Sequence, residues 1–82
     1  MRLDKYLKVS RIIKRRTVAK EVCEGGRVTI NGKVAKPSIE VKEGDIIEIR
    51  YANKSLKAEI LNIAAHVTKA NVQSMYRIIS TE

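Results

Sequence analysis

The chain has 82 residues, of which 44% are apolar and 32% charged, with a formal net charge of +8 at pH 7. This composition is typical of a small globular domain and excludes a disordered chain, but a domain of this length buries only about 60–65% of the surface its unfolded form exposes, which leaves little room for an enclosed active site. The single cysteine excludes an internal disulfide. No apolar run approaches the ~18 residues of a membrane span, so we expect a cytoplasmic protein without membrane contact.

The net positive charge lies entirely in the first part of the chain. Residues 1–36 hold eleven basic and three acidic residues, a difference of +8, whereas residues 37–82 hold six of each sign. A one-sided cationic field attracts polyanions, of which nucleic acid is the commonest. The alternative is a solvated face that only improves solubility.

Two short helices are predicted at the start. Leu3, Tyr6 and Leu7 recur at helical spacing within residues 2–10, and Asp4 stands in the first turn, where it could either favour the helix dipole or orient a neighbouring arginine. A second helix is predicted over residues 15–24, with Cys23 on its apolar face as a small core residue.

The pattern then changes from helix to strand. Gly25 and Gly26 end the second helix, and Asn31-Gly32 between RVTI and KVA is a strong signal for a β-hairpin. The turn preference alone could explain the asparagine, so its role in binding stays open. Gly32 is interpreted as purely structural.

The remaining chain predicts more sheet. Pro37 ends the hairpin, Glu43-Gly44-Asp45 is a turn before a strand over residues 46–51, and SLKAEILNI from residue 55 is the next strand. For the tail there are two alternatives: a helix from Lys69 to about Met75, capped by Thr68 and followed by a strand in YRII, or a continuous helix to Ile79. The fold class is therefore α+β, in one domain over residues 1–82.

No catalytic or metal-binding constellation is present in the sequence. His66 is the only histidine and has no carboxylate within three residues, and Cys23 has no neighbouring base. We therefore expect a protein that is not an enzyme and has no cofactor or metal. Tyr6 and Tyr76 are expected in the core, while the place of Tyr51 stays open.

The first half of the chain resembles the S-four RNA-binding domain, whose αL motif has two helices followed by a hairpin. The motifs that carry the resemblance are RLDKYL at 2–7, Arg11, KRRTVAKEV at 14–22, GGRVTINGK at 25–33 and EGD at 43–45. They cover a motif core of about residues 1–51. The short length and the MYRII tail are similar to a narrower group, the ribosome-associated quality-control P-site factors and the related heat-shock-protein-fifteen family.

The resemblance implies that the two helices pack on a small, mostly antiparallel sheet and that the helix pair and the hairpin grip folded RNA through its phosphates and shape. The candidate RNA-binding residues are Arg2, Lys5, Lys8, Arg11, Lys14, Arg15, Arg16, Lys20, Asn31 and Lys33. Single-stranded RNA fits less well, because three tyrosines make a poor stacking platform.

The resemblance also implies a function. A monomer would bind large-subunit ribosomal RNA and peptidyl-tRNA and stabilise the P-site tRNA during ribosome-associated quality control, while a partner adds an alanine tail to the stalled chain. Three alternatives stay open: a factor for recycling large subunits that carry blocked peptidyl-tRNA, a DNA-binding helix-turn-helix protein, and a module whose basic face meets an acidic protein.

Overall fold

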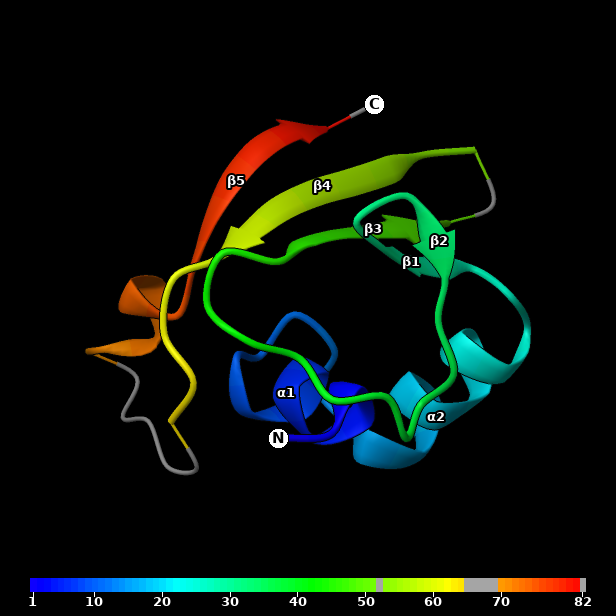
Figure 1. Cartoon of the computed structure of the whole chain (residues 1–82), viewed down its shortest axis with the longest axis horizontal. Helices are drawn as coiled ribbons and strands as arrows, with labels where there is room; N and C mark the ends of the chain where they lie inside the picture. The colour runs from blue at the N-terminus through cyan, green and yellow to red at the C-terminus, as the bar shows by residue number, and fades with distance from the viewer. Residues whose placement is uncertain (52, 65–69, 82) are drawn as a thin grey trace.

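In the described part of the chain, five antiparallel strands form one sheet with two helices on one side (Figure 1), which confirms the α+β prediction. A computed structural model describes residues 1–51, 53–64 and 70–81. The strand order is β2-β1-β3-β4-β5. The elements in chain order are α1 (Leu3–Val9), α2 (Arg16–Glu24), β1 (Val28–Ile30), β2 (Lys33–Val34), β3 (Ile46–Arg50), β4 (Ser55–Ile60), the 3-10 helix η1 (Val72–Ser74) and β5 (Tyr76–Thr81).

The predicted first helix forms because its apolar residues share one face. Leu3, Tyr6 and Leu7 are fully buried. Instead of a side-chain cap, the loop after β2 covers the first turn: the amide of Leu3 donates to the carbonyl of Ile39 at 2.8 Å, and that of Asp4 to the carbonyl of Pro37 at 3.1 Å. The start of α1 is thereby fixed to a segment more than thirty residues away.

The second helix also ends as the sequence predicts. Ala19 and Cys23 are buried on its inner face. The amide of Gly26, whose φ is +74°, donates to the carbonyl of Cys23, and the amide of Arg27 donates to that of Val22. This is the Schellman arrangement, which needs a left-handed residue that glycine adopts without steric cost.

The hairpin turn is confirmed and is joined to a second turn. Asn31 (φ 52°) and Gly32 (φ 86°) both have positive φ, as a type I′ turn requires. The Asn31 side chain accepts from the amide of Ile46 at 2.9 Å and donates to Asp45 Oδ1 at 3.1 Å. Asp45 is buried and also accepts from the amide of Lys42 at 3.0 Å. These bonds lock the hairpin against the start of β3.

The closing strand of the tail is confirmed, and the alternative of a continuous helix to Ile79 is wrong. Tyr76 pairs with Ile60 in the sheet, and Arg77 forms an ion pair with Glu59. The described part of the predicted helix is only the single turn of η1, and its proposed cap, Thr68, lies outside the described residues, as does His66. Pairing with β4 therefore overrides the helical pattern of the tail.

The core lies between the sheet and the helices, and Tyr6 links α1 to the segment before β5. Its hydroxyl donates to the carbonyl of Met75 at 2.7 Å, and burial raises the pKa of this phenol, with a smaller contribution from Tyr76. Tyr76 packs against the core and Tyr51 is exposed, so the prediction for Tyr6 and Tyr76 is confirmed.

Cys23 is a core residue, as predicted. It is 3% exposed, and burial, with smaller contributions from the Asp4 and Glu24 carboxylates, raises the pKa of its thiol to about 11. The thiol is therefore protonated at neutral pH, when it is a poor nucleophile.

Within the ranges that the structure describes, no helix has the length and apolar character needed to cross a membrane.

Candidate nucleic-acid interface

The predicted RNA-binding residues lie mainly on the two helices and the loop between them. Lys5 is half-buried and the other nine are exposed. Arg2 is the N-cap residue of α1, and Lys5 and Lys8 lie within that helix. Arg16 and Lys20 belong to α2, and the hairpin carries Asn31 and Lys33. The loop between the helices carries Arg11, Lys14 and Arg15. The charge is thus accessible to a polyanion.

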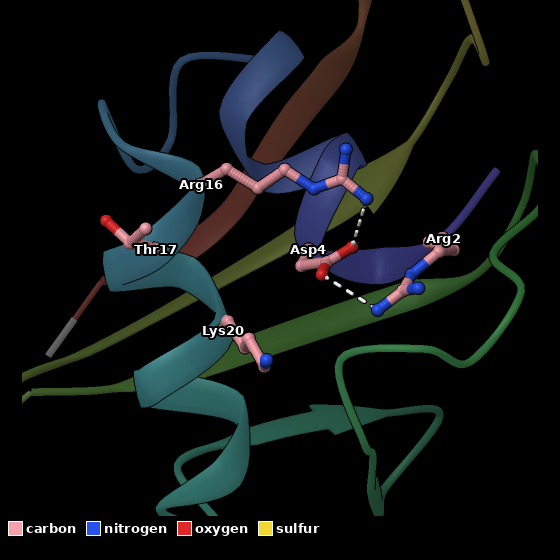
Figure 2. A pocket seen from close by; sticks show the side chains of 5 residues that line it. All are labelled: Arg2, Asp4, Arg16, Thr17 and Lys20. Carbon is pink, nitrogen blue, oxygen red and sulfur yellow. Dashed lines mark hydrogen bonds and ion pairs between the residues drawn. The ribbon is translucent and has the colours of Figure 1, made fainter.

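A buried carboxylate organises part of this charge (Figure 2). Asp4 is 2% exposed; its Oδ2 accepts from Arg2 Nη2 at 3.1 Å, and its Oδ1 accepts from Arg16 Nη2 at 3.4 Å. Its Oδ1 also accepts from the amide of Lys5 at 2.7 Å. The sequence left two roles open for Asp4, helix terminus or arginine orientation, and the structure shows both.

The two arginines keep most of their hydrogen-bonding capacity. Each guanidinium carries five N–H donors in a rigid fork, and only one terminal nitrogen of each is bonded to Asp4. The Arg2 and Arg16 side chains are 47% and 48% exposed. Because Asp4 restricts their rotamers in advance, less entropy is lost when they bind a phosphate.

Around this cluster, α1 and α2 form a pocket of about 320 Å³ lined by Arg2, Asp4, Arg16, Thr17 and Lys20. All five side chains are visible in Figure 2, where Arg16, Thr17 and Lys20 come from α2. The pocket is an open, cationic depression with one carboxylate at its base. It fits an anionic group that approaches from solvent.

Arg11 holds an unusual backbone conformation in the loop after α1. Its φ is 63°, a left-handed geometry that costs a non-glycine residue about 1–2 kcal/mol. The turn is fixed by the amide of Arg11 donating to the carbonyl of Lys8 and by that of Ile13 donating to Leu7. Arg11 is exposed at this position, where glycine would be less strained.

The structure brings only some of the predicted residues together. Arg2, Arg16 and Lys20 line one pocket, whereas Lys5, Lys8, Arg11, Lys14, Arg15, Asn31 and Lys33 do not line it. The Asn31 amide is engaged with Asp45 and Ile46, which supports its structural role.

Sequence reasoning missed Thr17 and Lys36. Lys36 lines an adjacent pocket together with Arg2 and Lys20. Its place in the cationic part of the chain, directly before Pro37, was the available signal.

Comparison with known proteins identifies the class. The S4 domain profile matches residues 1–47, and the chain belongs to the S4 domain family. Proteins named RQC P-site tRNA stabilizing factor are close in sequence. The one from Halalkalibacterium halodurans is 54% identical over 82 residues, covering 100% of this chain and 93% of the relative. The one from Streptococcus pneumoniae is 55% identical over 80 residues, covering 98% and 91%.

A solved structure has the same fold. Vibrio cholerae heat shock protein 15, described as trimeric, superposes with a TM-score of 0.88 at 34% identity, covering 98% of this chain and 82% of that one. The resemblance expected from the sequence is therefore confirmed.

We expect Asp4→Asn to weaken binding to a folded RNA even though it makes the protein more positive. Asparagine keeps one acceptor oxygen and turns an amide N–H₂ toward the other arginine, so the pair loses its fixed geometry. The free energy of unfolding should fall by about 1–3 kcal/mol, since charge-assisted hydrogen bonds are lost. Affinity and denaturant unfolding are measured alongside Glu48→Gln, the same charge change on β3. A rise in affinity for both variants would contradict the positioning role.

Arg11→Gly should separate backbone strain from binding. Glycine relieves the left-handed strain but adds unfolded-chain entropy, so the free energy of unfolding should stay equal or rise by up to about 1 kcal/mol. The RNA affinity of the glycine variant should fall by several fold, and that of Arg11→Lys, which keeps the charge, should fall less. Unchanged affinity in the glycine variant would show that the side chain makes no contact with RNA.

Proposed function

We propose that this chain is a non-enzymatic RNA-binding factor that stabilises tRNA in the ribosomal P site. The observation that carries the proposal is the pair of exposed arginines held by buried Asp4 within a cationic helix pair. It is supported by relatives named RQC P-site tRNA stabilizing factor, which match nearly the whole chain at 54–55% identity.

The mechanism is stabilisation by binding. The guanidinium forks of Arg2 and Arg16 reach paired phosphate oxygens of a folded RNA, and Lys20 adds a point charge beside them. Lys5, Lys8, Arg11, Lys14, Arg15 and Lys33 extend the contact along the helices and the hairpin. A factor that touches ribosomal RNA and tRNA at once lowers the free energy of one tRNA position, and no bond needs to be made or broken.

The finer proposal concerns partners. One copy of the chain contacts large-subunit ribosomal RNA and peptidyl-tRNA after a stalled ribosome has split, and an alanine-tailing factor then extends the nascent chain on the same particle. The net charge of +8, which lies in residues 1–36, disfavours pairing of two copies through this face.

A second candidate is the recycling of large subunits that carry blocked peptidyl-tRNA. The likeness to Vibrio cholerae heat shock protein 15 favours it. The higher sequence identity to the P-site factors, over more than nine-tenths of both chains, supports the first proposal more strongly.

Arg16→Ala should weaken binding to large ribosomal subunits that carry peptidyl-tRNA by about tenfold, the effect of losing one charge-assisted contact of about 1.4 kcal/mol. The matched control is Lys57→Ala on β4, which removes the same charge from an exposed position in the sheet and should change affinity less than about twofold. Binding is measured by co-sedimentation over a range of salt, with circular dichroism to confirm folding. An equal loss of affinity in both variants would mean that binding depends only on net charge, and it would contradict the proposed site.

A further inference from the structure

A second pocket lies beside the arginine cluster, between α2 and the chain that follows β2. Its volume is about 560 Å³, within the range of ~300–1,000 Å³ that is usual for ligand sites. In Figure 1 the segment after β2 runs down past α2 toward the start of α1. Arg2 and Lys20 line both pockets, so the two form one continuous surface.

The second pocket combines apolar walls with a cationic rim. Cys23, Val34, Ala35 and Pro37 supply the apolar part. Of these, Val34 is 68% exposed, although it stands on a surface otherwise dominated by charge. Arg2, Lys20 and Lys36 supply the cations, and one carboxylate, Glu24, also lines the site.

The walls are held in place before any ligand arrives. The amide of Asp4 donates to the carbonyl of Pro37 at 3.1 Å, and that of Ala35 to the carbonyl of Val28 at 3.0 Å. Arg2 is held by Asp4. The pocket is therefore preformed, and little ordering entropy is lost when it is filled.

We propose that this pocket takes one unstacked nucleobase of the bound RNA, with the flanking phosphates on Arg2, Lys20 and Lys36. The inference rests on the RNA-binding function proposed above and names the structural feature of the RNA that the site recognises: a bulged or looped nucleotide beside a helix. An apolar face and an adjacent negative charge within one covalent unit are what a nucleotide offers to such a site.

The charges define how the nucleotide lies. A phosphate at the border of the two pockets contacts Arg2 and Lys20 together, which leaves the base against Val34 and Pro37. Glu24 repels phosphate but accepts a hydrogen bond from an exocyclic amino group, which adenine carries. The probe below therefore carries adenine at the unpaired position.

The test uses three RNA hairpins with the same stem: one with a single bulged adenosine, one with an abasic residue at the bulge, and one with an uninterrupted stem. The 82-residue chain should bind the bulged-adenosine hairpin about tenfold more tightly than the abasic one, the gain expected from burying part of one base against aliphatic side chains. Free adenosine monophosphate should compete only at far higher concentration, because it lacks the phosphates along the stem.

Variants assign the preference to the pocket. Val34→Ser removes two exposed methyl groups and should reduce the preference for the base by about threefold or more, whereas Val34→Ile keeps an apolar contact and should retain it. Arg16 lines only the first pocket. Arg16→Ala should therefore weaken binding to all three hairpins equally and leave the preference for the base unchanged.

Each failure has a distinct meaning. Equal affinity of the wild-type protein for the bulged and abasic hairpins would overturn the base site while leaving RNA binding intact. A uniform loss in Val34→Ser for all three hairpins would also overturn it. No measurable binding to any of the hairpins would contradict RNA binding itself, and with it the proposed function.

Discussion

The buried carboxylate of Asp4 is the contact on which the candidate interface depends. It bonds the first turn of α1 and pairs with arginines from two segments, so one side chain sets the local backbone and the direction of the cations. Removing a carboxylate from water is costly unless it is paired and hydrogen-bonded, and these three contacts supply that compensation. The same turn of α1 is fixed by the carbonyls of Pro37 and Ile39, which couples the arginine pair to the wall of the neighbouring pocket.

The small hydrophobic core must keep the cationic helix pair folded although its charges repel one another. The sheet and the hairpin provide the rigidity, because the Asn31 and Asp45 side chains link the two turns through hydrogen bonds. Tyr6 links α1 to the segment before β5 in a similar way. The hairpin carries Asn31 and Lys33, and the loop that follows it holds the start of α1 through the carbonyls of Pro37 and Ile39.

Local signals made most of this fold predictable. Helical periodicity located α1 and α2, the glycine pair ended α2, and Asn31-Gly32 located the hairpin. The sequence allowed either a strand or a continuous helix in the tail, because its pattern also suits a helix. Pairing with β4, which the sequence does not reveal, stabilises the strand. In the site, the cationic residues followed from composition, but the burial of Asp4 and the inclusion of Thr17 and Lys36 depend on packing between segments distant in sequence.

The most direct measurement of the central claim is the position of the tagged protein among ribosomal particles separated on a gradient from its own cells. We predict that it sediments with free large subunits that still carry tRNA and that it leaves them after nuclease treatment. Recovery only in the soluble fractions would contradict a role at the P site. It would leave the fold and its membership of the S4 domain family unchanged.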